Sequence, residues 1–297
     1  MSNAELTAAA QESELPSLNR QILERRALKS GLLTTLTWIA AILASIPLFS
    51  VIYMLVVQGG ARVDLEALTA LPPAGFEMGG GFGNAIVGTL VMVGIAAIVS
   101  VPLGILAAIY LAILDPSSKI ASLSRFLAKV LTGMPSILAG VFAYAAVVLL
   151  MGTYSAWAGG IALAVLMLPT VVLTAEEALK MVPQRMKDAA FGMGCTRSQV
   201  IWKVVLPTGL PGVVTGVMLA VAGAAGESAP LLFTALFSNY YISELAEPTA
   251  SLSILIYNFS GMPFDNQIEL AWAASLVLVL IVLVFNILAR LFGQPKV

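Results

Sequence analysis

The sequence predicts an all-α, polytopic membrane protein with about six transmembrane helices. Hydrophobic residues occupy 59% of its 297 positions and charged residues only 10%, and the mean hydropathy is +0.97. Soluble domains carry about a quarter charged residues, so this composition cannot cover a surface that faces water on all sides. The apolar residues are also gathered into long runs, and a helix needs a run of roughly 20 residues to cross a bilayer.

Six apolar stretches are predicted to form the transmembrane helices. The second contains Pro102, which predicts a kink because proline lacks the N–H that a helix interior requires. The fourth is the shortest, with Gly159 at one end and Pro169 near the other. The six stretches are Gly31–Val57, Asn84–Leu114, Leu131–Met151, Gly159–Thr174, Pro211–Phe237 and Leu270–Leu291.

The basic residues lie almost entirely on one side of these stretches. Of the 15 Lys and Arg residues, all but Arg62 fall before the first stretch, between the second and third, between the fourth and fifth, or at and beyond the end of the sixth. The positive-inside rule makes that side the cytoplasm, so both termini are expected there. We expect cytosolic tails at 1–30 and 293–297 and a membrane domain at 31–292. The first tail begins acidic, unlike the basic start of a signal peptide.

Composition also narrows the classes of function. A net charge of −1 leaves no basic excess for nucleic acid. Histidine is absent and Cys195 is the single cysteine, so the commonest base, the commonest zinc ligand and an internal disulfide are missing. Two alternatives to a permease that a partner protein powers are a membrane enzyme and a secondary transporter with inverted repeats. A membrane enzyme needs a cluster of protonatable groups, and a secondary transporter needs an internal repeat or several intramembrane charges. The sequence shows none of these features.

The cytoplasmic segment 175–209 is predicted to fold as a helix, a glycine turn and a second helix. Pro183 suits the first position of the first helix. Gly194 tolerates the left-handed conformation that ends a helix. Thr196 and Gln199 form a capping box for the second helix.

One face of the first predicted helix is small and apolar. Such a face allows another protein to approach closely, so we interpret the segment as a docking element for a cytosolic partner. An amphipathic hairpin that lies on the membrane is the alternative. The second helix is expected to stop at Pro207. The face consists of Met186, Ala189, Ala190 and Met193.

This segment resembles the coupling loop of binding-protein-dependent ABC importer permeases of the MetI-like type. In that family a Glu-Ala-Ala sequence is followed by a glycine, as Asp188-Ala189-Ala190 is followed here by Gly194, four residues after Ala190. The family motif then ends in an aliphatic residue, any residue, Leu and Pro, as in Val204–Pro207. Asp188 stands here where glutamate is usual, which leaves open whether a carboxylate contact is kept. The resemblance implies that the loop docks on a separate ATPase. The residues concerned are Arg185, Asp188, Ala189, Ala190, Gly194, Arg197, Leu206 and Pro207.

The resemblance also implies partners and a location. The chain has no Gly-x-x-x-x-Gly-Lys-Ser/Thr sequence, which binds nucleotide phosphates in P-loop proteins. We therefore expect no cofactor and no enzyme activity in this chain, with ATP and Mg bound by an ABC ATPase dimer. A second permease subunit, an extracytoplasmic binding protein and membrane lipid complete the expected partners. The expected location is the bacterial plasma (inner) membrane.

Two further stretches resemble the A-type permease subunit of phosphate-specific (Pst) importers. Gly223–Ala235 is similar to its Gly-Glu-Thr-Ala-Pro-Leu-Leu segment, and Met134–Ile137 with Gly140 is similar to its Pro-Ser-Ile motif. The resemblance implies inorganic phosphate as the substrate, a distinct C-type second permease and a phosphate-binding protein. Molybdate or sulfate is the alternative substrate.

Glu227 is the only acidic residue within the six predicted stretches. A charge inside the bilayer costs about 3 kcal/mol, so such a residue usually faces a pathway or a partner. Its carboxylate can accept the proton of a hydrogen phosphate, which sulfate lacks, or it can pair with an arginine of a second permease. The cationic half of an anion site is left unexplained by this chain. Hydroxyl groups are the other pathway candidates, although each can bond to its own helix instead: Thr89, Thr132, Ser136 and Ser228.

Overall fold

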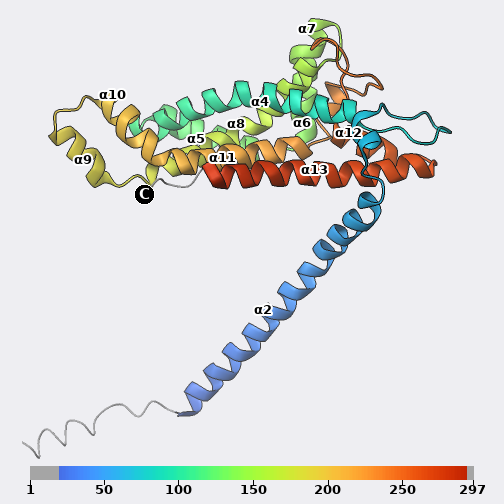
Figure 1. Cartoon of the computed structure of the whole chain (residues 1–297). Coiled ribbons are helices and arrows are strands. Elements are labelled where there is room, and N and C mark those ends of the chain that lie inside the picture. Colours follow the sequence, from blue (N-terminus) through green and yellow to red (C-terminus); the bar gives the residue numbers. More distant parts are fainter. Residues whose placement is uncertain (1–19, 293–297) are drawn as a thin grey trace, which may run out of the picture. The chain divides into compact units, whose positions relative to one another are not determined.

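The computed structural model describes residues 20–292, which form helices joined by turns and loops, without a strand (Figure 1). The chain divides into two units, residues 1–54 and 55–297, and each is described by itself. The predicted all-helical fold is confirmed. Of the predicted tails, residues 1–19 and 293–297 lie outside the described residues, whereas residues 20–30 form the start of a helix.

The first unit contains one long helix, α2 (Arg20–Met54), which runs through Pro47 without ending. From Arg26 onward almost every side chain of this helix is exposed within the unit. A helix that is apolar on all sides requires lipid or other apolar surroundings. α2 therefore has the character of the predicted first span.

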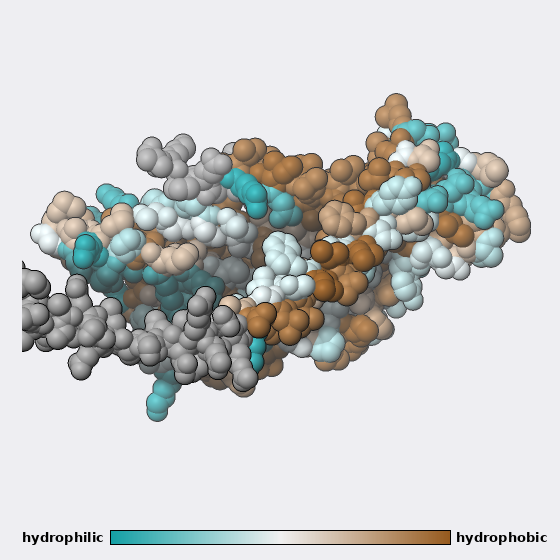
Figure 2. Space-filling view, turned by 90° about the horizontal axis from the view of Figure 1, so that it is seen from below, coloured by the Kyte–Doolittle hydropathy of each residue, from teal (hydrophilic) through white to brown (hydrophobic). Residues whose placement is uncertain are grey.

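The second unit is built around four long helices, α4, α8, α11 and α13, with shorter helices at both ends (Figure 1). Figure 2, which draws both units, shows many apolar side chains on the visible surface of the chain. The helices of this unit are η1 (Leu55–Gly59), α3 (Leu65–Thr69), α4 (Gly83–Ile109), η2 (Tyr110–Leu114), α5 (Lys119–Thr132), α6 (Ser136–Ala143), η3 (Tyr144–Val148), α7 (Leu149–Met151), α8 (Ala156–Lys180), α9 (Gln184–Gly192), α10 (Arg197–Val200), η4 (Ile201–Val205), α11 (Leu206–Gly226), η5 (Leu231–Phe233), α12 (Leu252–Ser260) and α13 (Asp265–Phe292).

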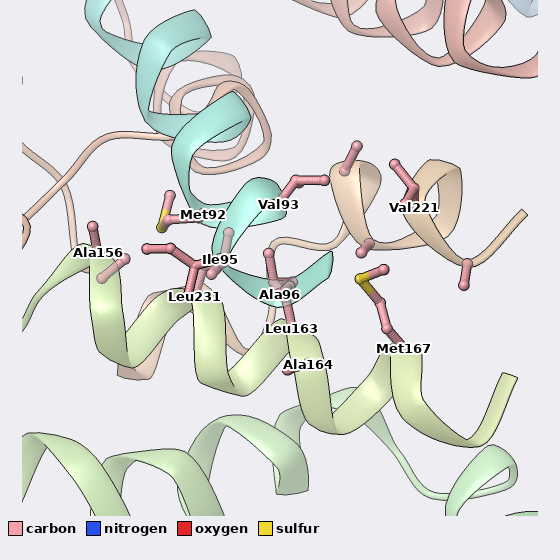
Figure 3. Packing of buried hydrophobic residues seen from close by; sticks show 14 of the residues in the cluster. Met92, Val93, Ile95, Ala96, Ala156, Leu163, Ala164, Met167, Val221 and Leu231 are labelled. Atoms are coloured by element: carbon pink, nitrogen blue, oxygen red, sulfur yellow. The ribbon is translucent and has the colours of Figure 1, made fainter. Parts of the chain in front are cut away.

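Small residues allow these helices to approach closely. A Cβ atom at Gly104 of α4 would lie 2.6 Å from the Val171 side chain of α8. A Cβ atom at Gly216 of α11 would lie 2.2 Å from Thr174 of the same helix α8. Such close contacts stabilise helix packing where water supplies no hydrophobic driving force. The main core cluster lies between these helices, and Figure 3 shows Met92, Ile95, Leu163, Met167 and Leu231 within it.

The third predicted span differs in the structure. Five helices among the described residues are long and apolar enough to cross a membrane, and a sixth span requires α5 and the helix after it to count as one bent pair. The pair bends by 105° at a break around Gly133–Pro135, so the predicted span Leu131–Met151 is interrupted near its start: Leu131 and Thr132 end the first arm, and Ser136–Met151 forms the second. Pro135 cannot donate to a helix and disfavours α conformation at Met134, which breaks the helix there.

The fifth predicted span, Pro211–Phe237, also has different ends. The helix starts at Arg197 and passes through Pro207, so the predicted stop at this proline is wrong. The wider π turn η4 precedes Pro207, and the Leu206 N–H donates to the Ile201 carbonyl five residues earlier. The proline then falls in the first turn of α11, where its missing N–H is tolerated.

α11 ends at Gly226, before the predicted end of the span. Pro230 follows four residues later and disfavours α conformation at Ala229, so the helix does not resume there. Glu227 lies at the end of the helix with an extended backbone (φ −74°, ψ 124°), and not inside a continuous span as predicted.

Candidate substrate pocket and docking loop

A pocket of about 310 Å³ lies between α5, α6, α8 and α11. Three of the five predicted pathway residues line it, although they come from three separate segments: Thr132, Ser136 and Glu227. None of the described residues that line the pocket is Lys or Arg. The full lining is Leu131, Thr132, Met134, Ser136, Leu166, Met167, Thr170, Leu219, Ala220, Gly223, Ala224 and Glu227.

The break between α5 and α6 brings two of these residues to the pocket. α5 ends at Thr132 and α6 begins at Ser136 after the extended Pro135 (φ −55°, ψ 131°). The first N–H groups of a helix have no carbonyl partner within it and carry the positive end of the helix dipole. The break therefore sets hydroxyl and amide donors beside the pocket, which a straight helix could not do.

The backbone of Glu227 is fixed on both sides. Its N–H donates to the Ala224 carbonyl at 3.2 Å, and its own carbonyl accepts a hydrogen bond from the Ser253 hydroxyl at 2.9 Å. Ser253 belongs to α12 and is only 6% exposed. The carboxylate therefore extends from an anchored backbone, at a side chain that is partly exposed toward the pocket.

The two stretches that resemble phosphate permeases meet in space. A Cβ atom at Gly140 of α6 would lie 2.7 Å from the Cα atom of Pro230. Only glycine allows α6 to pack this closely on the segment that follows Glu227. The motif around Ser136 and the motif around Glu227 thus form one wall.

The hydroxyl groups have different environments. Thr132 donates to the Ala128 carbonyl of its own helix at 2.7 Å, so its oxygen is left to accept. Thr89 is buried outside the pocket lining, where it donates to the Ala85 carbonyl and accepts from the Leu252 N–H at 2.9 Å. Thr89 thus fastens α12 to α4, and no contact of it points to a pathway.

Ser228 is also outside the pocket lining. Its carbonyl accepts hydrogen bonds from Leu231 and Leu232, so its backbone starts the turn after Glu227. Thr170, in contrast, lines the pocket but was not among the predicted residues. Its position beside Pro169 in an apolar stretch is the signal that could have identified it.

The docking loop consists of α9, α10 and the turn between them, and its predicted helix caps are present. Gly194 has a φ of +81°, and its N–H donates to the Phe191 carbonyl at 2.9 Å. The Cys195 N–H donates to the Ala190 carbonyl at 3.1 Å, which completes a Schellman motif at the end of α9. The Thr196–Gln199 capping box at the start of α10 is confirmed. Pro183 is the N-cap residue of α9 and precedes its first residue.

The predicted small face of α9 is divided. Ala190 is 2% exposed and packs in a cluster with Val182, Val200 and Ile201 of the same chain. Met186, Ala189 and Met193 are exposed. A partner can therefore reach the methionines and Ala189, whereas Ala190 supports the loop from within.

The other predicted docking residues fall into three environments. Arg185 is exposed, as is Asp188, which accepts a hydrogen bond from the Gln184 amide at 2.8 Å. Leu206 is partly buried and Pro207 is exposed. Arg197 donates to the carbonyls of Ile113 and Leu114, so its guanidinium holds another part of this chain.

An ion-pair cluster close to the docking loop was not predicted from the sequence. Glu176 lies in α8, which continues beyond the predicted end at Thr174, and it is only 3% exposed. Its carboxylate contacts Arg125 at 2.6 Å and Lys180 at 2.5 Å. Glu176 and Glu177 therefore lie in a membrane-length helix, whereas Glu227, the only acidic residue in the predicted stretches, follows the end of one. Among the described residues, no three His, Cys, Asp or Glu side chains are grouped to hold a metal ion.

The fold and the pocket define an all-helical, multi-pass membrane protein of the permease class. Residues 100–295 match the family of binding-protein-dependent transport system inner membrane components, and the chain belongs to that family. It is 38% identical to the phosphate transport system permease protein PstA of Pasteurella multocida, over 91% of this chain and 96% of that protein. It is 39% identical to the protein of the same name from Yersinia pestis, over 83% of both chains.

Solved structures show the same fold. A chain of a bacterial alginate ABC transporter, crystallised with an alginate pentasaccharide-bound periplasmic protein, matches 93% of this chain and 97% of its own length. The TM-score is 0.61 at 16% sequence identity. The predicted permease fold is thus confirmed.

Proposed function

We propose that this chain is a transmembrane permease subunit of an ATP-driven phosphate importer. Three observations support the proposal: the family of the chain, its similarity to phosphate permeases over about nine tenths of its length, and the pocket. The observation that carries it is the carboxylate of Glu227, which lines the same pocket as Ser136.

The pocket chemistry fits a protonated oxyanion. Inorganic phosphate keeps at least one P–OH proton at neutral pH, and the Glu227 carboxylate accepts it. The Ser136 hydroxyl and the first amides of α6 donate to the other phosphate oxygens. Sulfate has no proton for the carboxylate and leaves two negative groups facing each other.

Other subunits complete the transporter. The described lining residues include no cation, so a distinct C-type permease supplies positive charge from the open side of the pocket. α9 and α10 dock on an ABC ATPase dimer that binds ATP and Mg. A phosphate-binding protein delivers substrate at the opposite face. The chain lies in the bacterial inner membrane with both termini in the cytoplasm, which agrees with the distribution of its basic residues.

The substrate is tested with Glu227→Gln in a strain that lacks the native chain. The amide keeps the shape but loses the charge, so phosphate uptake should fall by about tenfold or more while the complex still assembles. Arsenate, which carries a proton, should compete as phosphate does, and sulfate should gain relative to both. Glu177→Gln is the control because Glu177 is exposed on α8 and outside the pocket lining.

The outcomes separate the alternatives. A uniform loss for all oxyanions, rescued by a substitution in the second permease, would identify Glu227 as a structural ion-pair partner. Phosphate uptake at the wild-type rate by the Glu227→Gln variant would show that Glu227 is not part of the substrate pathway. Uptake of molybdate or sulfate in place of phosphate by the unaltered complex would contradict the assigned substrate.

A further inference from the structure

One arginine joins three segments at the end of the molecule that carries the docking loop. The Arg125 Nε donates to the Glu176 carboxylate at 2.6 Å, Nη1 donates to the Pro116 carbonyl at 2.8 Å, and Nη2 donates to the Leu111 carbonyl at 2.6 Å. Arg125 belongs to α5, Glu176 to α8 and Leu111 to η2. A planar guanidinium holds several acceptors in fixed directions, which an ammonium group cannot do.

The contacts of Arg125 with Glu176 and Leu111 are partly buried, whereas its contact with Pro116 is exposed. The Glu176 side chain is 4% exposed and the Arg125 side chain 23%. The Leu111 carbonyl lies in the last turn of η2, where carbonyls lack a partner within the helix. Arg125 therefore caps one helix while its ion pair holds a second helix to a third.

Arg197 ties the docking loop to the same helix end. It is the first residue of α10, directly after the capping-box residue Thr196. Its Nη2 donates to the Ile113 carbonyl at 2.8 Å and to the Leu114 carbonyl, the final residues of η2. The docking loop, η2, α5 and α8 are thus linked in series by two arginine side chains.

The same helices carry the pocket walls. Thr132 of α5 lines the pocket about two helical turns beyond Arg125, and Thr170 of α8 lines it about two turns before Glu176. The Arg125–Glu176 pair therefore fixes the spacing of both walls at their docking-loop end.

We infer that Arg125 is a positioning residue that transmits movement of the docking loop to the α5 wall of the substrate pocket. The inference rests on the proposed function, because it requires an ATPase that moves α9 and α10. When these helices move, α8 and α11 move with them, because the chain continues from α8 into α9 after three residues and from α10 directly into α11. Arg197 carries η2 along, and Arg125 makes α5 follow η2 and α8. Without Arg125 the α5 wall can stay behind while the other walls move.

Arg125→Lys tests this inference in proteoliposomes that contain the complete transporter. Lysine keeps the charge opposite Glu176 but cannot hold three acceptors at once. We expect ATP hydrolysis within about twofold of wild type and phosphate transported per ATP lower by about tenfold. Arg197→Lys, which loosens only the link between α10 and η2, should lower the same ratio.

Lys180→Met is the matched control. Lys180 contacts the same Glu176 oxygen, but it is 48% exposed and lies one turn away on the same helix, so it links no second element. The phosphate transported per ATP by the Lys180→Met variant should stay within about twofold of wild type.

Two results would overturn the inference. One is an unchanged transport per ATP in both arginine variants. The other is a proportional loss of hydrolysis and transport, which indicates a general structural role. If the unaltered complex transports another oxyanion, the transport of that ion per ATP is measured instead. A wrong substrate assignment is thereby distinguished from a failure of the inference about Arg125.

Discussion

The two ends of the second unit are held together in different ways. At the end that carries α9 and α10, two arginines bind the last carbonyls of η2 and a buried carboxylate. At the end that carries α3 and α12, the backbone of residues 69–82 is bound mainly by neutral side chains, together with the Glu66 and Glu77 carboxylates. The Asn266 amide donates to the Glu77 and Gly79 carbonyls, and the Tyr241 hydroxyl donates to the Thr69 carbonyl at 2.6 Å.

Backbone packing adds to these neutral bonds at the α3 end. A Cβ atom at Gly81 would lie 2.4 Å from the Ala67 carbonyl oxygen, and one at Gly88 would lie 2.0 Å from the Ala250 carbonyl oxygen. Gly192 and Gly194, at the docking-loop end, have no such neighbour within 4 Å. The comparison teaches that one end depends on close backbone contact and the other on a few long charged side chains. The charged end is the one that must transmit movement in the proposed transporter.

The largest expected effect is that of Gly88→Val. The new side chain would overlap the Ala250 backbone in a buried position, and overpacking of this kind costs about 3 kcal/mol. We expect a marked loss of folded protein and a lower melting temperature in detergent. Gly94→Val on the same helix, where nothing lies within 4 Å, is the control. Equal melting of both variants would show that backbone contact does not hold this end.

The next effect compares a glutamate at each end. Glu176→Gln leaves Arg125 without its countercharge, which should destabilise the protein by about 2 kcal/mol, because Arg125 keeps two carbonyl partners. Glu66→Gln should change stability by less than about 0.5 kcal/mol, since the amide oxygen can still accept from the Gly80 N–H. Thermal unfolding of the two variants measures the difference. A larger loss for Glu66→Gln would reverse the comparison.

The smallest effect is that of Tyr241→Phe. It removes one neutral hydrogen bond at an exposed site and should cost about 0.5–1 kcal/mol. Tyr240→Phe is the control, because Tyr240 is 74% exposed and its hydroxyl makes no hydrogen bond with another described residue. Thermal unfolding again provides the measurement. A loss above that of Glu176→Gln would mean that single neutral bonds dominate the α3 end.

Local chemistry made much of this protein predictable from its sequence. Apolar runs identified the membrane-length helices, because a backbone in lipid must satisfy its hydrogen bonds within a helix. Gly194 and the Thr196–Gln199 pair identified the helix ends of the docking loop, because caps act over only a few residues. Ser136 and Glu227 were predicted as pathway residues because they are polar groups within apolar stretches.

Only the tertiary structure decided how these parts meet. The bend at Pro135 and the end of α11 at Gly226 depend on how the flanking helices pack, so an apolar run alone does not locate them. Ala190 looked like a docking residue but is buried against its own chain. Arg125 and Glu176 are 51 residues apart in the sequence, and no periodicity links them. Their pairing follows from the packing of α5 on α8, because short-range rules fix helices and caps, whereas long-range packing decides which side chains become neighbours.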